Sequence, residues 1–133
     1  MARPLALLAA SLTSIALALG CGRQSDPASA PGDNADYDAV TLGQRMQSPA
    51  PPVIIDVREP SEFAEGHLHG ARNIPIGQLE ARAGEVPSDK PIVLVCQGGT
   101  RSARARDILV AKGRRNVHNF TDGMSGWNGA LER

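Results

Sequence analysis

Two short apolar runs stand out in the chain after residue 36. Residues 53–57 follow a proline cluster and are mostly β-branched, and residues 92–95 are apolar throughout. Short runs of this kind are typical of strands buried on both faces of a parallel sheet. We therefore predict two central strands, which would carry Asp56, Arg58 and Cys96 to their C-terminal ends.

Helical patterns lie on both sides of the first run. Residues 40–46 predict a helix whose first turn is capped by Thr41, with the Gln44 side chain reaching back to complete a capping box. Residues 59–66 predict one or two helical turns that end at Gly66. The first strand is therefore expected to lie between two helices.

The rest of the chain alternates in the same way. The expected elements are an extended segment at 71–75, a helix at 76–83, a helix at 101–112 with Gly113 as its C-cap, a short strand at 116–120, and a helix at 123–131 anchored by Trp127. Strands that alternate with helices predict an α/β domain with a mostly parallel sheet. Ligand sites in such domains lie beyond the C-terminal ends of the strands.

Length and charge limit the possible functions. A chain of 133 residues is long enough for one hydrophobic core, so we expect one folded domain. Lys and Arg number 14, as do Asp and Glu, so the chain has no overall field to attract a polyanion. We expect no nucleic-acid partner.

The first twenty residues differ from the rest. Arg3 is their only charge, and their apolar stretch is shorter than the roughly 18–20 residues of a spanning helix and ends in small residues. This pattern predicts a signal peptide at 1–20. Residues 22–36 have no large apolar side chain and predict a flexible tether. The folded domain is expected at 37–133.

The end of the signal segment, Ala18-Leu19-Gly20-Cys21, resembles the lipobox of bacterial lipoproteins. By that resemblance Cys21 would be the lipidated first residue of a tether at 21–36, anchored in the cell envelope and facing the periplasm or the exterior. Gly22 would favour the outer membrane where two membranes are present. The usual lipobox has Leu at position 18 and a small residue at position 19, so an ordinary signal with nearby cleavage stays open.

The loop after the second apolar run carries the candidate chemistry. It consists of Cys96, Gln97, Gly98, Gly99 and Thr100, and the predicted helix follows at Arg101. Adjacent glycines permit positive φ, so successive amides can point at one centre, and the helix adds the positive end of its dipole. Both effects favour a thiolate, which is the nucleophilic form of cysteine.

The number of cysteines supports a chemical role for Cys96. If Cys21 carries lipid, Cys96 has no partner in its own chain in a compartment where cysteines usually pair. The alternative is a small buried core residue, as free cysteine often is.

Several separated motifs together resemble a single-domain rhodanese over about residues 37–133. They are Asp56-Val57-Arg58-Glu59, Phe63, Gly66-His67, Gly70-Ala71-Arg72-Asn73-Ile74-Pro75 and the segment from Cys96 to Ser102. The resemblance implies an α/β, rhodanese-like fold with about five mostly parallel strands and helices on both faces. It also implies a sulfurtransferase, which would move sulfane sulfur from a small anionic donor such as thiosulfate to a thiol or cyanide acceptor.

The resemblance also implies roles for single residues. Cys96 would be the nucleophile and persulfide carrier, and Arg101 would help to bind the anionic donor. The substrate-binding residues would be Gln97, Gly98, Gly99, Thr100, Arg101 and Ser102, and the loop would be supported by Asp56, Arg58 and His67. For Asp56 and Arg58, a plain structural ion pair and direct substrate contact both stay open. We expect no cofactor and a monomer.

The histidines do not predict a metal site. Leu68-His69 stands where the family commonly has a proline, so the local turn is expected to differ. His67 is expected to be structural rather than a general base, and His69 and His118 are expected at the surface. Three separated histidines without a second available cysteine make a poor site, so we predict no metal.

Two alternatives to sulfur transfer remain. Phosphatases and arsenate reductases of this fold have one more residue between cysteine and arginine than the four residues from Gln97 to Thr100. The smaller loop suits a single sulfur. The second alternative is a non-catalytic module that binds an envelope partner or senses oxidants through Cys96.

Overall fold

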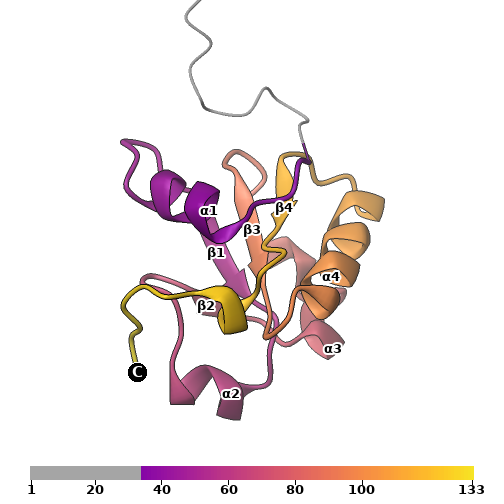
Figure 1. Cartoon of the computed structure of the whole chain (residues 1–133). Helices are drawn as coiled ribbons and strands as arrows, with labels where there is room; N and C mark the ends of the chain where they lie inside the picture. Colours follow the sequence, from indigo (N-terminus) through magenta and orange to yellow (C-terminus); the bar gives the residue numbers. More distant parts are fainter. Residues whose placement is uncertain (1–33) are drawn as a thin grey trace, which may run out of the picture.

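The computed structural model describes residues 34–133, so the expected signal peptide, Cys21 and the first part of the tether lie outside the described residues. The sheet is parallel, with the strand order β2-β1-β3-β4 (Figure 1). Its strands are β1 (Val53–Asp56), β2 (Arg72–Asn73), β3 (Ile92–Val95) and β4 (Val117–Asn119). Beyond β4, Tyr37 adds a single parallel bridge to Phe120. About five strands were expected; residues 34–133 form four, with one bridge at the place of a fifth.

The two apolar runs form the centre of this sheet, as predicted. β1 and β3 pair along their whole length, from Val53 opposite Ile92 to Asp56 opposite Val95. Because successive side chains of a strand point to opposite faces, each strand contributes to two separate cores. Because the two strands are parallel and Asp56 lies opposite Val95, Asp56 and Cys96 lie at the same edge of the sheet.

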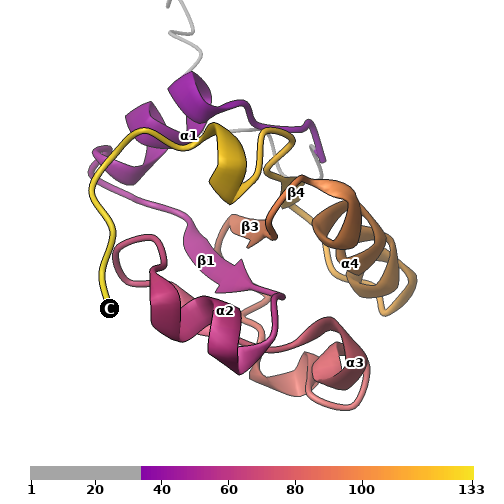
Figure 2. The same ribbon diagram turned by 60° about the horizontal axis from the view of Figure 1, so that its bottom comes forward.

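Helices cover both faces of the sheet (Figure 2). α3 (Ile76–Leu79) and α4 (Thr100–Ala111) pack on one face, over a core that includes Ile55, Leu94 and Leu109. α1 (Ala39–Met46) and a C-terminal turn cover the other face, over Leu42, Phe120 and Trp127. α2 (Pro60–Glu65) lies beyond the C-terminal ends of the strands.

The helix starts and ends differ in places from the prediction. α1 begins with Asp38 as its N-cap, whose carboxylate accepts a hydrogen bond from the Thr41 amide at 2.7 Å. The predicted capping box of Thr41 and Gln44 is therefore wrong. α3 ends at Leu79 and is followed by a separate 3-10 turn, Ala83–Glu85, which buries Ala83.

α2 and α4 confirm the sequence pattern. α2 ends at Glu65 with Gly66 as its C-cap. Gly113 has the left-handed conformation, with φ of +82°, and directly follows Lys112, the C-cap of α4. Ala105 and Leu109 are the apolar side chains of α4 that are buried against the sheet.

The predicted helix at 123–131 does not form. The segment contains only a 3-10 turn, Met124–Gly126, and the backbone of Trp127 is extended. Gly123 has φ of +62°, and Gly129 lies so close under Trp127 that a Cβ would be 2.7 Å from the indole ring. Trp127 still anchors the segment, because its ring meets Phe120 edge-on at 6.2 Å.

The start of the described chain packs on the domain. The side-chain oxygen of Asn34 accepts a hydrogen bond from the Val117 amide at 3.0 Å. His118 was expected at the surface, but it is buried: its ring stacks on Tyr37 at 4.2 Å, and Nδ1 lies 2.6 Å from the Ala35 carbonyl. Residues 34–36, which were assigned to the tether, therefore contact the folded part.

Candidate active site

Cys96 directly follows β3 and is almost fully buried, with 1% of its surface exposed. Its Sγ accepts hydrogen bonds from the backbone amides of Gly99 and Ser102, at 3.1 and 3.4 Å. The Ser102 hydroxyl lies 3.2 Å from the same sulfur and can donate to a thiolate. Donors from the loop and from the first turn of α4 thus converge on one atom, as in an anion-binding nest at a helix N-terminus.

The surroundings of Cys96 favour its ionised form. Burial raises the pKa of the thiol, but the hydrogen bonds from the Ser102 hydroxyl and from the amides of Ser102, Gly98 and Gly99 outweigh burial and lower the pKa below its usual value. A lowered pKa increases the fraction of the nucleophilic thiolate near neutral pH. Within residues 34–133 Cys96 is the single cysteine, and it is free.

The two loop glycines have different roles. Gly99 takes the left-handed conformation, with φ of +87°, and a Cβ there would lie 2.3 Å from the Thr121 carbonyl oxygen. A Cβ at Gly98 would meet no atom within 4 Å. The close approach of Gly99 to residue 121 directs its amide at Sγ, so only one of the two glycines is sterically required.

A turn at residues 122–126 holds the loop from the other side. The amide of Met124 donates to the Cys96 carbonyl at 2.9 Å, and the amide of Ser125 donates to the Gln97 carbonyl at 3.0 Å. The Gln97 side chain also donates to the Ser125 hydroxyl, at 2.9 Å. This contact was missed because a helix was predicted there, although three glycines within residues 123–129 are a signal against a helix.

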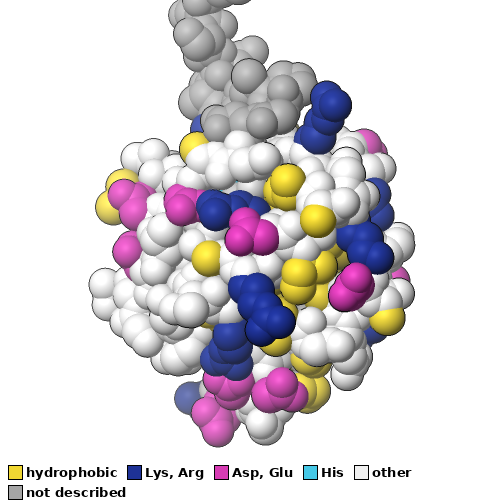
Figure 3. Space-filling model, turned by 90° about the vertical axis from the view of Figure 1, so that its right-hand side faces the viewer, with side chains coloured by type: hydrophobic (Ala, Val, Ile, Leu, Met, Phe, Trp, Pro, Cys, Tyr) yellow, Lys and Arg dark blue, Asp and Glu magenta, His cyan; other side chains and the backbone are white. Residues whose placement is uncertain are grey.

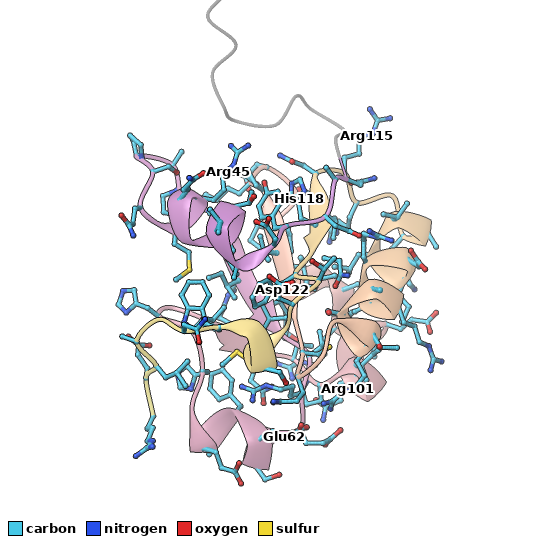
Figure 4. The ribbon with its side chains drawn as sticks, viewed as in Figure 1. Arg45, Glu62, Arg101, Arg115, His118 and Asp122 are labelled. Carbon is cyan, nitrogen blue, oxygen red and sulfur yellow. The ribbon has the colours of Figure 1, made fainter. Side chains whose placement is uncertain are left out.

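Arg101 does not extend freely into the site. Its two terminal nitrogens donate to the two carboxylate oxygens of Glu62, at 2.8 and 2.9 Å, across the gap between α4 and α2 (Figure 4). The hydrogen bond from Arg101 lowers the pKa of Glu62 to about 2, so Glu62 is a carboxylate at neutral pH. Glu62 was not among the predicted site residues; the pair joins positions 39 residues apart, and no local pattern marks it.

Asp56 and Arg58 form a buried ion pair. Nη2 of Arg58 lies 2.7 Å from Oδ2 of Asp56, and it also donates to the Gly66 carbonyl at 2.8 Å. With the side chains only 1% and 5% exposed, the pair has almost no surface for a substrate to contact. Through the Gly66 carbonyl the pair supports the end of α2, the helix that carries Glu62. Asp56 also pairs with Val95 in the sheet, so the pair lies next to the strand that ends at the cysteine loop.

His67 lies in the turn after α2 and has structural contacts. Its ring stacks on Phe63 at 3.7 Å, and Nδ1 lies 2.9 Å from the Phe63 carbonyl. His69 is exposed, as expected, and contacts the carboxylate of Glu132, which also accepts from the Gly70 amide at 3.2 Å. The Leu68-His69 departure therefore meets the C-terminal segment rather than the cysteine loop.

The remaining predicted residues lie at the rim of the loop, where Gln97, Gly98 and Thr100 are exposed. On the face shown in Figure 3, acidic side chains lie among the basic ones, and no broad patch of one charge forms. No group of three potential metal-ligating side chains occurs within residues 34–133. None of the helices in this part of the chain is long and apolar enough to cross a membrane.

The fold and the site together define an α/β protein with one cysteine in an amide-lined loop at the C-terminal end of a central strand. The profile of the Rhodanese-like domain family matches residues 38–130. The chain therefore belongs to the rhodanese-like family.

Known relatives agree with this assignment. The chain is 30% identical over 92 residues to a protein named sulfurtransferase from Allochromatium vinosum, covering 69% of this chain and 86% of that protein. It is 46% identical over 79 residues to the uncharacterized protein YqhL of Bacillus subtilis, of which the match spans 63%. The crystal structure of a rhodanese-like domain protein from Staphylococcus aureus superposes with a TM-score of 0.69 at 28% identity, covering 75% of this chain and 97% of that one.

Proposed function

We propose that this protein is a sulfurtransferase in which Cys96 carries sulfur as a persulfide. The observation that carries the proposal is the convergence of the Gly99 amide, the Ser102 amide and the Ser102 hydroxyl on Sγ. These donors stabilise an anionic sulfur. Relatives named sulfurtransferase and thiosulfate sulfurtransferase support the choice of reaction.

The first half of the reaction loads the cysteine. The Cys96 thiolate attacks the outer sulfur of a donor such as thiosulfate, and a new S–S bond forms as the S–S bond of the donor breaks. Sulfite leaves with the electron pair of that bond, and Cys96 becomes a persulfide. This is covalent catalysis in two steps, so we expect ping-pong kinetics.

The second half of the reaction transfers the sulfur from Cys96 to an acceptor. A thiolate or cyanide attacks the terminal sulfur, the S–S bond to Cys96 breaks, and the Cys96 thiolate is restored as the leaving group. The products are a new persulfide or thiocyanate. The donors that stabilise the thiolate also make it a better leaving group, because they hold its negative charge.

Loop size favours sulfur over phosphate or arsenate. The loop has only four residues between Cys96 and Arg101, and two of its donors already lie 3.1 and 3.4 Å from Sγ. A single added sulfur needs less room than a tetrahedral oxyanion. Turnover of an aryl phosphate without any sulfur loading would support the alternative.

Loading of Cys96 can be tested by intact mass spectrometry. After thiosulfate treatment the full chain should gain the mass of one sulfur atom, and addition of cyanide should remove it. Cys96→Ser should abolish the gain, because the attacking thiolate is missing. Cys21→Ser is the matched control and should gain the same mass. A gain that persists in Cys96→Ser would disprove the mechanism, and a sulfenate or mixed disulfide in place of the persulfide would favour oxidant sensing.

We further propose that the protein is anchored in the cell envelope by a lipid on Cys21. The support is the sequence alone: the apolar segment, the lipobox-like Ala18-Leu19-Gly20-Cys21 and the polar stretch after it. The same mass measurement on protein from membranes would report the lipid. A mature chain that begins elsewhere and carries no acyl chain would point to an ordinary signal peptide.

A further inference from the structure

Arg101, the residue expected to bind the sulfur donor, is hydrogen-bonded to a carboxylate of the protein itself. Arg101 is the positively charged side chain nearest to Cys96 in the sequence, and both of its terminal nitrogens are hydrogen-bonded to Glu62. A bidentate pair uses the edge of the guanidinium that would otherwise bind an oxyanion end-on. A donor that needs this edge must therefore compete with a carboxylate of the protein.

Glu62 is held in place from its own helix. It is the third residue of α2, and its carboxylate also accepts a hydrogen bond from the Glu59 amide at 3.0 Å, as part of a capping box. Arg101 and Glu62 are 37% and 33% exposed, so the pair lies at the edge of the site and is open to solvent and ligands.

The charges around the sulfur do not favour a dianion. Two guanidinium groups, Arg58 and Arg101, lie near the carboxylates of Asp56 and Glu62. With Cys96 as a thiolate, this group carries one net negative charge. Removing the charge of Glu62 would bring the net charge of this group to zero and would leave Arg101 without its carboxylate partner.

We propose that Glu62 determines which sulfur donors the site accepts: by neutralising Arg101 it disfavours the dianion thiosulfate relative to donors with a single negative charge. Thiosulfonates and persulfides of small thiols belong to the favoured class. This inference deepens the proposed function and rests on it for the identity of the reaction. The electrostatic part concerns Cys96 itself and can be measured without any sulfur transfer.

The first experiment probes the charge around Cys96 by alkylation. Iodoacetate is an anion and iodoacetamide is neutral, and both alkylate thiolates with the same leaving group. In Glu62→Gln, the ratio of the iodoacetate rate to the iodoacetamide rate should rise several-fold, because one negative charge close to the thiolate is gone. Gln can still complete the capping box, so the fold of α2 is retained.

The matched control is Glu65→Gln. Glu65 is on the same helix and is exposed, and its backbone carbonyl, not its carboxylate, makes the hydrogen bond seen to Arg133. This variant removes the same charge from α2 but leaves Arg101 paired, so the alkylation ratio should stay within about twofold of wild type. An equal rise in both variants would mean that general surface charge, and not the pair, is responsible.

The second experiment compares two donors with the same outer sulfur, thiosulfate and methanethiosulfonate, with cyanide as the acceptor. Glu62→Gln should raise kcat/KM for thiosulfate relative to methanethiosulfonate on the order of tenfold, mainly through a lower KM, because the extra charge of the dianion meets less repulsion. Glu65→Gln should leave the ratio unchanged.

The outcomes separate this inference from the proposed function. If neither donor loads sulfur onto wild-type Cys96 although the alkylation ratio shifts in Glu62→Gln, the proposed reaction is wrong and the electrostatic role of Glu62 stands. If sulfur is loaded but neither ratio changes in Glu62→Gln, the reaction stands and this inference is overturned.

Discussion

Two carboxylate–guanidinium pairs lie at the C-terminal ends of the strands, and they differ in almost every property except chemistry. Asp56 and Arg58 are two residues apart in sequence, and their side chains are 1% and 5% exposed. Glu62 and Arg101 are 39 residues apart, and their side chains are 33% and 37% exposed. The first pair holds the turn at Gly66, whereas the second contains Arg101, whose charge interacts with that of Cys96.

The difference shows how burial decides what an ion pair can do. A buried pair has lost its water, so removing one partner leaves a charge that nothing compensates. A half-exposed pair costs little to break, because water replaces each partner. We therefore expect the pair of Asp56 and Arg58 to be structural, and the pair of Glu62 and Arg101 to be the one that an anionic ligand can open.

The largest expected effect comes from breaking the buried pair. Arg58→Met should lower the free energy of unfolding by about 3–5 kcal/mol, because Asp56 remains buried without its partner and the Gly66 carbonyl loses its donor. Arg101→Met is the matched variant in the exposed pair and should cost no more than about 1 kcal/mol. Urea unfolding followed by circular dichroism measures both.

A double variant tests the reason for this difference. Asp56→Asn combined with Arg58→Met removes both charges and should recover part of the lost stability, since no lone charge is then buried. Equal losses for Arg58→Met and Arg101→Met, or no recovery in the double variant, would show that burial does not separate the two pairs.

We expect the shape of the cysteine loop to depend more on Gly99 than on either ion pair. Gly99→Ala forces a left-handed residue with a Cβ 2.3 Å from the Thr121 carbonyl oxygen. We expect a loss of about 2 kcal/mol or more in stability and slower sulfur loading, because the Gly99 amide moves away from Sγ.

Gly98→Ala is the control for this prediction, because a Cβ there meets nothing within 4 Å and the residue is exposed. It should change stability by no more than about 0.5 kcal/mol. Similar losses in both variants would mean that the loop needs flexibility at each glycine, and not one left-handed residue.

Local patterns in the sequence predicted the central features well. The apolar runs located β1 and β3, and the order of runs and helical patterns predicted the parallel sheet. Cys96 could be placed at the end of a strand for the same reason. These inferences succeed because the spacing of apolar residues and the positions of glycine act over a few neighbouring residues.

Contacts between distant segments could not be predicted in this way. The partner of Arg101 is on another helix, and the turn that supports Cys96 and Gln97 was mistaken for a helix. His118 was placed at the surface because its stacking on Tyr37 depends on the path of the chain before α1. A polar residue signals its chemistry locally, but its partner is set by the whole fold.

The smallest effect, and a direct measure of the exposed pair, is its response to acid. The hydrogen bond from Arg101 lowers the pKa of Glu62 to about 2, from an ordinary value of 4.5. A lowered carboxyl pKa stabilises the fold fully above pH 4.5 and progressively less as the pH falls toward 2.

Wild type should therefore exceed Glu62→Gln in stability by at most about 1 kcal/mol at pH 7, and the difference should shrink toward zero near pH 2. Urea unfolding between pH 7 and pH 3 follows the difference, and it should be absent at every pH when both chains also carry Arg101→Met. A difference that is constant with pH, or that survives the loss of Arg101, would mean that the ion pair is not the source of the stability that Glu62 adds.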